Sequence, residues 1–208
     1  MKLREQDNFV VLGGFLGVTA LLAALVLAVV SQLTAEPINA AKERTRQAVF
    51  HRLGLPDFDR TGEECIYEGI IFTPVYKGGE ICGFIGQGSG SGYGGEIIVL
   101  TGFDSVGKIT GVQILQHKET PGLGANVCNR KFQRTIFNFK EKAPEIPANR
   151  YLDQFNGAKA SDSGAWKIRK DGGTFDFMTG ATVTGRAVTA IVDSIARKFV
   201  LWQKGEIK

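Results

Sequence analysis

Three threonine hydroxyls stand close together near residue 180 of the chain. Thr179 and Thr182 flank Gly180 and Ala181, and Thr184 follows two residues later. The small residues leave the backbone accessible, and a regular apolar pattern begins directly afterwards. A polar turn that opens a helix presents free N–H groups and the positive end of the helix dipole, which together suit a phosphate group. The alternative is structural, because a threonine in front of a helix is ordinarily an N-cap.

The helix expected after this turn is amphipathic. Between residues 183 and 201 the apolar side chains recur at helical spacing, and charged residues fall largely elsewhere. We expect one face to pack on the rest of the domain through Val188, Ile191, Val192, Ile195 and Phe199.

A second stretch that could form a site follows a predicted strand. Residues 117–124 read His-Lys-Glu-Thr-Pro-Gly-Leu-Gly, a charged run followed by turn residues. Loops at strand ends often carry binding residues, although an ordinary turn explains this composition equally well. A metal site is not expected, because His51 and His117 are the only histidines and have no ligand spacing.

Five glycines lie between residues 88 and 95, around a single Tyr93. This stretch lacks the Lys-Ser/Thr pair of a phosphate-binding P-loop. It also leads into a strand-like segment rather than into a helix. We therefore expect a flexible or closely packed loop, with ligand contact as the less favoured alternative.

The middle of the chain predicts antiparallel strands joined by short turns. Residues 68–76 and 81–85 form one predicted hairpin, and residues 96–103 and 108–116 form another around the turn residues 104–107. Short turns rather than crossover helices favour an α+β fold with a mainly antiparallel sheet packed by helices. Further predicted elements are a helix over residues 126–139, a short strand over residues 166–170 and a turn over residues 171–173.

The N-terminal region predicts a single transmembrane helix. Phe9–Val30 is a run of 22 residues in which Thr19 is the only clearly polar side chain. As a helix this run would span about 33 Å, enough for a bilayer core, and it is longer than the apolar part of a signal peptide. We therefore expect an uncleaved anchor in residues 1–35 and one domain in residues 36–208, with its first helix starting near Pro37.

The charge of the chain excludes one class of partner and leaves the orientation open. The net charge is only +4, and no basic run is interleaved with aromatic residues, so nucleic-acid binding is not expected. Lys2 and Arg4 precede the anchor beside Glu5 and Asp7, and three basic residues follow it between positions 42 and 46. By itself this pattern leans toward a cytoplasmic domain.

The three cysteines are Cys65, Cys82 and Cys128, and they contain no Cys-x-x-Cys pair. Neither an iron–sulfur cluster nor a zinc site is therefore expected. In an exported domain Cys65 and Cys82 could form a disulfide, and buried free thiols are an equally acceptable outcome.

Taken together, these stretches resemble one family over essentially the whole chain. Asp176-x-x-Thr-Gly-Ala-Thr182 is similar to the flavinylation signature Asp-x-x-Ser/Thr-Gly-Ala-Ser/Thr. The anchor, residues 117–124 and residues 166–173 occur in the order and spacing of the G subunit of the Rnf-type electron transport complex. The related C subunit of the sodium-pumping NADH:quinone reductase is generally longer, so this compact chain resembles the former more closely.

The resemblance implies a role for individual residues. It implies FMN held covalently through a phosphodiester to Thr182, with Thr184 as a neighbour that does not accept the flavin. A flavin transferase that uses FAD is expected to recognise Asp176, and Lys170 is expected to neutralise the phosphate or the reduced ring. Further residues expected to contact the FMN, none of them an acceptor, are Glu119, Thr120, Leu123, Gly124, Thr179, Gly180 and Ala181.

The function implied by the resemblance is that of an electron relay. The family implies a single-pass protein of the bacterial inner membrane, with its domain on the periplasmic side. Together with other subunits it would move electrons between reduced ferredoxin and NAD and couple this transfer to ion translocation. The Gly-x-Gly-x-x-Gly pattern of residues 90–95 leads into a strand-like segment rather than opening a helix, so the chain itself is not expected to bind NAD. Three alternatives stay open: the C-type subunit of the sodium pump, a stand-alone membrane-anchored flavin reductase, and a structural anchor without a cofactor.

Overall fold

The computed structural model describes residues 3–131, 144 and 146–204. Its internal packing divides the chain into two compact units, residues 1–46 and residues 47–208. The functional boundary expected after residue 35 stays a prediction.

The first unit consists of most of α1 (Leu3–Phe50), a helix of 48 residues that is long and apolar enough to cross a membrane. Its large apolar side chains, such as Phe9 and Leu27, are exposed in the isolated chain. The prediction of an N-terminal apolar helix is confirmed. The predicted new helix start near Pro37 is wrong, because Pro37 lies inside α1. A proline removes one helical N–H donor, and the helical bonds on either side continue α1 past it.

Among its described residues, the second unit contains one sheet of six strands, all paired antiparallel. The main path runs β1-β3-β4-β5-β6, and β2 pairs with β3 beside β1. The predicted α+β fold with a mainly antiparallel sheet is confirmed. The strands are β1 (Arg60–Thr61), β2 (Cys65–Tyr67), β3 (Ile70–Lys77), β4 (Glu80–Ser91), β5 (Glu96–Asp104) and β6 (Ile109–Gln116).

The turn between β5 and β6 shows why this hairpin was predictable. The carboxylate of Asp104 accepts hydrogen bonds from the N–H groups of Val106 (3.0 Å) and Lys108 (2.8 Å). Gly107 has a φ of +81°, a conformation that favours glycine. The side chain and the glycine therefore close the turn locally, without help from distant residues.

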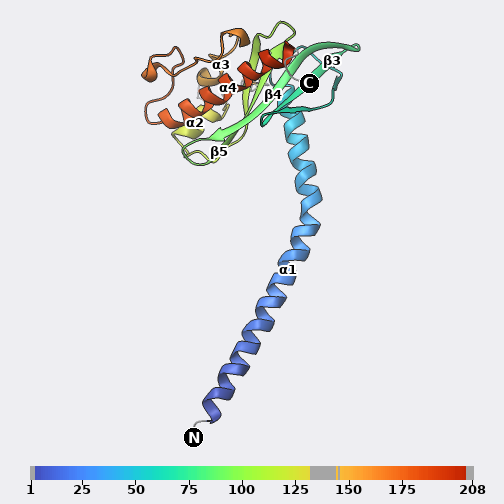
Figure 1. The fold of residues 1–208 in the computed structure, drawn as a ribbon, viewed down its shortest axis with the longest axis vertical. Helices are drawn as coiled ribbons and strands as arrows, with labels where there is room; N and C mark the ends of the chain where they lie inside the picture. The colour runs from blue at the N-terminus through green and yellow to red at the C-terminus, as the bar shows by residue number, and fades with distance from the viewer. Residues whose placement is uncertain (1–2, 132–143, 145, 205–208) are drawn as a thin grey trace. The chain divides into compact units, whose positions relative to one another are not determined.

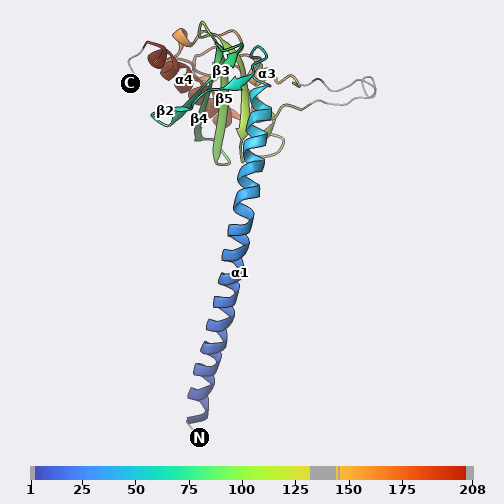
Figure 2. The same ribbon diagram turned by 90° about the vertical axis from the view of Figure 1, so that its right-hand side faces the viewer.

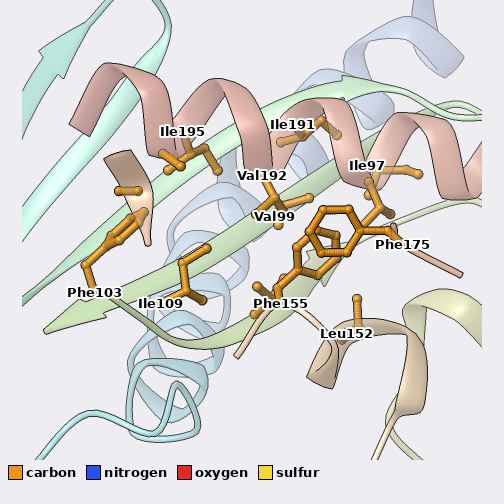
Figure 3. Close-up of a cluster of buried hydrophobic side chains, with 14 of the residues drawn as sticks. Ile97, Val99, Phe103, Ile109, Leu152, Phe155, Phe175, Ile191, Val192 and Ile195 are labelled. Carbon is orange, nitrogen blue, oxygen red and sulfur yellow. The ribbon is translucent and has the colours of Figure 1, made fainter. Parts of the chain in front are cut away.

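The last helix, α4 (Thr182–Gln203), runs along one face of the sheet (Figures 1 and 2). The apolar face predicted from its periodicity is buried, and Figure 3 shows Ile191, Val192 and Ile195 above the strands. Phe199 stacks on Phe103 of β5 with ring centroids 4.3 Å apart. Burying each such side chain stabilises the fold by about 1.5–3 kcal/mol.

Glycines on β4 allow α4 to lie close to the sheet. Gly86, Gly88 and Gly90 alternate along β4 and face the helix, because side chains two residues apart share one face of a strand. A Cβ added at Gly88 would lie 2.9 Å from Ile195 Cγ1, and one at Gly90 would lie 2.8 Å from Ile191 Cγ1. The predicted loop over residues 88–95 is therefore wrong for residues 88–91, which belong to strand β4. The close packing of these glycines was one of the two outcomes expected.

The opposite face of the sheet carries a smaller core. Phe50, at the end of α1, and Leu53 are buried there with Val75, Ile85 and Leu100. The chain is fixed at this point, because the carbonyl of Leu53 accepts a hydrogen bond of 2.8 Å from the hydroxyl of Thr110. The sheet is thus covered on both faces, and α4 covers the larger core.

The helix predicted over residues 126–139 is only partly present. The observed helix α2 (Gly124–Cys128) ends before Asn129, which is extended, and residues 132–139 lie outside the described residues. The amide of Asn149 donates to the carbonyls of Val127 (2.9 Å) and Asn129 (3.0 Å). These bonds replace the helical partners that the end of α2 would otherwise need. Asn149 also caps the short helix α3 (Arg150–Asp153).

The strand predicted over residues 166–170 is wrong. Only Ile168 pairs, in an isolated bridge with Phe175, and the chain then enters the 3₁₀ helix η2 (Arg169–Asp171). A strand needs a neighbouring strand for its hydrogen bonds, and this segment has only a single bridge. The predicted turn follows at Gly172, which has a φ of +82°. A further 3₁₀ helix, η1 (Ala160–Asp162), precedes this segment.

Candidate functional site

The open end of α4 forms the centre of the candidate site. Gly180 has a φ of +92°, Ala181 occupies the N-cap position, and no side chain caps the helix there. The first helical bond is Gly185 N–H to the carbonyl of Ala181 (2.9 Å). Within the described residues, the N–H groups of residues 182–184 therefore have no acceptor. The structural alternative of a threonine N-cap is wrong, and this helix end can accept an anion.

The three threonines of the turn have different surroundings. Thr182 is half-buried, and its Oγ1 accepts a hydrogen bond of 3.1 Å from Lys170 Nζ. Thr184 is 1 % exposed and donates its hydroxyl to Glu119 Oε2 at 2.5 Å. Thr179 is exposed in the turn before the helix. Thr182 therefore combines an accessible hydroxyl, a neighbouring cation and the free N–H groups of the first helical turn.

Glu119 is a buried carboxylate that joins three segments. It is 5 % exposed, and its Oε1 accepts a hydrogen bond of 3.0 Å from Gly94 N–H, while Oε2 accepts the bond from Thr184. Its own N–H donates to His117 Nδ1 (3.1 Å), and His117 Nε2 lies 3.1 Å from Asn129 Oδ1. These partners fix the neutral His117 tautomer that carries its proton on Nε2. Glu119 thus ties the β4–β5 turn to the start of α4.

The stretch over residues 117–124 is a compact loop that leads into α2. The carbonyl of Thr120 accepts hydrogen bonds from the N–H groups of Leu123 (3.2 Å) and Ala125 (3.1 Å). Gly122 has a φ of +82°, and a Cβ at Gly124 would lie 2.5 Å from Thr184 Oγ1. The loop therefore packs directly on the first turn of α4, which an ordinary surface turn would not do.

These segments line a cavity of about 500 Å³ that is open to solvent. It is lined by eight of the residues expected at the cofactor, which the structure brings together from three separate segments. Pockets for small molecules and cofactors are typically about 300–1,000 Å³ and combine apolar walls with a few polar groups. The eight residues are Glu119, Thr120, Leu123, Gly124, Lys170, Gly180, Ala181 and Thr182.

A second hollow of about 320 Å³ lies on the other side of Thr182. Thr182 and Lys170 line both hollows, whereas Asp176 and Thr179 line only the second one. The backbone of Asp176 is held by Gln154, whose Oε1 accepts its N–H (2.7 Å) and whose Nε2 donates to its carbonyl (3.0 Å). The Asp176 side chain is exposed. Asp176 and Thr179 are thus adjacent to Thr182 but outside the main cavity.

Among the described residues around Thr182, the ammonium group of Lys170 is the cation in contact with its hydroxyl. Arg186 binds both carboxylate oxygens of Asp171 at 2.7 Å, and this hydrogen-bonded ion pair lowers the pKa of the Asp171 carboxyl. Lys170 has no carboxylate partner among the residues that the structure describes. Its ammonium group is therefore available to an anion attached at Thr182.

The thiols take no part in this arrangement. All three cysteines are free, so the possible disulfide between Cys65 and Cys82 is not formed. Burial, together with the nearby Glu119 carboxylate, raises the pKa of the Cys128 thiol to about 12. Cys128 therefore stays protonated and unreactive at neutral pH. Among residues 3–131, 144 and 146–204, no group of His, Cys, Asp or Glu side chains is arranged to hold a metal ion.

Three residues that line the cavity were not among the expected cofactor contacts: Tyr93, Val183 and the buried Thr184. Tyr93 is 74 % exposed in the turn between β4 and β5, and Val183 is exposed on the first turn of α4. A signal for Tyr93 existed in the predicted hairpin. Neighbouring antiparallel strands bring the start of β5 and the end of β6 to the same end of the sheet. The turn that carries Tyr93 therefore had to lie near residues 117–124.

Comparison with known proteins places these residues in one family. The FMN-binding domain family matches residues 92–197, which include every residue of the main cavity. A protein of Cereibacter sphaeroides is 33 % identical over 197 residues, covering 90 % of this chain and 82 % of its own length. One of Stutzerimonas stutzeri is 31 % identical, covering 89 % of this chain and 77 % of its own length. One of Vibrio parahaemolyticus is 40 % identical over 103 residues, 49 % of this chain and 41 % of its own length.

All three relatives are named as the G subunit of an ion-translocating oxidoreductase complex. Two of them match along most of both chains, whereas the third matches about half of this chain. Their shared name favours this identity over the C-type subunit and the stand-alone reductase considered from the sequence. The chain therefore belongs to the family of the G subunits of ion-translocating oxidoreductase complexes and contains an FMN-binding domain.

Proposed function

We propose that this chain is an electron-carrying subunit of a membrane-bound ion-translocating oxidoreductase complex and that it holds FMN covalently, through a phosphodiester to Thr182. As the resemblance implies, the complex would exchange electrons between ferredoxin and NAD. The observation that carries the proposal is the position of Thr182, whose hydroxyl borders both hollows beside Lys170 at the open end of α4.

The polar side of the site fits the phosphate of FMN. The free N–H groups of residues 182–184 and the Lys170 ammonium group surround the Thr182 hydroxyl. An anion at a helix N-terminus gains only about 0.3–1 kcal/mol near the surface. That energy is too small to retain a cofactor, so a covalent bond to Thr182 would decide whether the site is occupied.

The apolar side of the site fits a planar ring system. Leu123 and Val183 are exposed apolar side chains that line the cavity, and Tyr93 adds an aromatic ring. FMN, when bound, supplies the redox chemistry through its isoalloxazine ring. The residues of the chain would hold this ring in one orientation and limit its contact with water.

Thr182 is unsuited to attach its own cofactor. Activation of a hydroxyl requires a base that takes its proton, but Lys170 donates to Thr182 Oγ1. We therefore assign the attachment to a separate flavin transferase that uses FAD as donor. Asp176, with its exposed side chain at the second hollow, would be read by that enzyme next to the acceptor.

In this proposal α1 crosses the lipid bilayer of the inner membrane and residues 36–208 lie in the periplasm. The apolar length of α1 supports a membrane span, and the family resemblance supports the orientation against the charge pattern. A reporter that is active only outside the cytoplasm, fused to the C-terminus, should be active. An inactive fusion at normal protein level would contradict this orientation.

The attachment is tested by mass spectrometry of the full-length chain produced together with a flavin transferase. The native chain should gain one FMN phosphodiester, and peptide mapping should place it on Thr182. Thr182→Ser should retain some flavin because the hydroxyl remains, whereas Thr182→Ala should retain none. Thr179→Ala is the matched control, and its flavin should still map to Thr182. Flavin on Thr179 or Thr184 of the Thr182→Ala chain would overturn the assignment.

A further inference from the structure

We propose that Tyr93 is the residue that covers the flavin ring and that the buried carboxylate of Glu119 positions it. The inference rests on the proposed function, because it concerns the ring of the same bound FMN. It gives Tyr93 direct contact with the cofactor and makes Glu119 a positioning residue that acts through the β4–β5 turn.

The surroundings of Tyr93 leave its ring available to a ligand. Its side chain is 74 % exposed and lines the cavity that also contains Thr182. Within the part of the chain that the structure describes, the ring packs against no other aromatic side chain. Its neighbours Gly92 and Gly94 have no side chains that could cover it. An aromatic ring buries a large apolar area when it stacks on another ring, so a flat conjugated ligand is the partner that this position suits.

The turn that carries Tyr93 is held at two points. Gly92 N–H donates to the carbonyl of Gly95 at 2.7 Å, which closes the turn. Gly94 N–H donates to Glu119 Oε1 at 3.0 Å, which ties the turn to the neighbouring loop. Tyr93 lies between these bonds, so its backbone is fixed although its side chain is exposed.

Glycines bring this turn close to Glu119. A Cβ added at Gly92 would overlap Glu119 Oε1, and one added at Gly94 would overlap the carbonyl of Lys118. Any larger residue would therefore push the turn away from the carboxylate. Glycine at positions 92 and 94 thus allows the turn to pack against residues 118 and 119, and this packing holds Tyr93 at the cavity.

The second carboxylate oxygen of Glu119 connects the Tyr93 turn to the start of α4, where Thr182 lies. Oε2 accepts the hydroxyl of Thr184, which lies in the first turn of α4 two residues after Thr182. One carboxylate thus holds both the turn that presents the aromatic ring and the helix end that presents the phosphate acceptor. This arrangement would set the separation between the ring and its anchor.

The test measures how well the protein shields its flavin from a soluble quencher. Full-length chains carrying FMN are titrated with iodide in detergent, and covalent flavin content is measured separately on a denaturing gel. Tyr93→Ser should raise the quenching constant by roughly twofold or more, because the stacked ring is lost. Tyr93→Phe should stay close to the native value, because the flat ring remains. All of these chains should carry the same amount of flavin.

Glu119→Asp keeps the charge but withdraws both oxygens by one methylene group. We expect a quenching constant between those of the native chain and Tyr93→Ser. Glu96→Asp, at an exposed carboxylate on the other side of the same turn, is the matched control and should match the native chain. Adding Tyr93→Ser to Glu119→Asp should raise the quenching no further than Tyr93→Ser does alone.

The outcomes separate this inference from the proposed function. If the chains carry flavin but Tyr93→Ser is quenched like the native chain, the role of Tyr93 is wrong and the proposed function stands. If Glu119→Asp matches Glu96→Asp, the positioning role of Glu119 is wrong. If the native chain made with its transferase carries no flavin, both the proposed function and this inference are overturned.

Discussion

The two ends of α4 have opposite roles: one is packed on the sheet, and the other is open beside the cavity. From Val188 to Phe199 the helix buries an unbroken apolar face on the sheet, where the glycines of β4 allow close approach. At Thr182 the helix begins with N–H groups that have no acceptor among the described residues and with exposed side chains beside a cavity. The close packing of one end fixes the position of the other. A site for an anion can therefore stay open and still be held in one position, because the packed end of α4 supplies the stability of the helix.

The largest effect should come from replacing, one at a time, the two threonines in the first turn of α4. Thr182→Val should abolish covalent flavin and change the free energy of unfolding by less than about 0.5 kcal/mol, as for most surface substitutions. Thr184→Val should keep the flavin but cost about 1–3 kcal/mol, because the buried Glu119 carboxylate loses a donor. In-gel flavin fluorescence and urea unfolding measure the two quantities. Equal flavin loss in both variants would contradict the distinction between the accessible hydroxyl of Thr182 and the buried hydroxyl of Thr184.

The packed end of α4 should be sensitive to a single added methyl group. Gly86→Ala places a Cβ against the rigid Cγ2 of Ile195 and 3.3 Å from Phe72 Cε1. Overpacking of this kind typically costs about 1–3 kcal/mol, measured as a loss in the free energy of unfolding. Ser89→Ala, at an exposed position of the same strand, is the control and should have little effect. A neutral Gly86→Ala would show that α4 can move away from the sheet without cost.

A smaller effect is expected at the cation beside the acceptor. Lys170→Met removes the donor to Thr182 Oγ1 but keeps much of the side-chain length. An exposed charge interaction of about 0.5–1 kcal/mol corresponds to a roughly two- to fivefold slower flavinylation. Lys167→Met, at an exposed lysine that lines neither hollow, is the control for lost charge. Equal rates for the two variants would mean that Lys170 acts only through the general charge of the domain.

The smallest effect concerns the ion pair that borders the open end of α4. The pKa of the Asp171 carboxyl is lowered by its hydrogen bonds to Arg186. The stabilisation is therefore fully present above the ordinary aspartate pKa of about 4 and is lost as the pH falls through the lowered value. The native chain should be slightly more stable than Asp171→Asn at neutral pH, and the difference should shrink below about pH 4. Thermal unfolding at several pH values measures it, and a difference independent of pH would contradict the ion-pair explanation.

Local chemistry in the sequence determined the elements that form without distant partners. The Asp104 carboxylate and Gly107 specify the turn between β5 and β6, and the apolar period of residues 183–201 specifies the buried face of α4. The antiparallel sheet followed, because short turns allow no other pairing. The run Phe9–Val30 likewise determined an apolar helix by its composition alone.

The failures came where the deciding partner was distant in the sequence. The glycines at residues 88 and 90 were predicted to lie in a loop, but they belong to strand β4, where α4 packs against them. The helix α2 ends early because the side-chain amide of Asn149, some twenty residues later, donates hydrogen bonds to the carbonyls of Val127 and Asn129. Composition cannot show such partners, since they are brought together only when the chain folds.

In the candidate site, too, some features follow from the local sequence and others depend on distant residues. The motif ending at Thr182 identified the segment, but it could not show which hydroxyl is free. For Thr184 this was decided by Glu119, which lies 65 residues earlier in the sequence and accepts a hydrogen bond from the Thr184 hydroxyl. The sheet likewise brought Tyr93 to the cavity by placing the β4–β5 turn beside the loop that follows β6. Residue types set what each group can do, and the tertiary structure decided which of them is exposed, paired and within reach of a ligand.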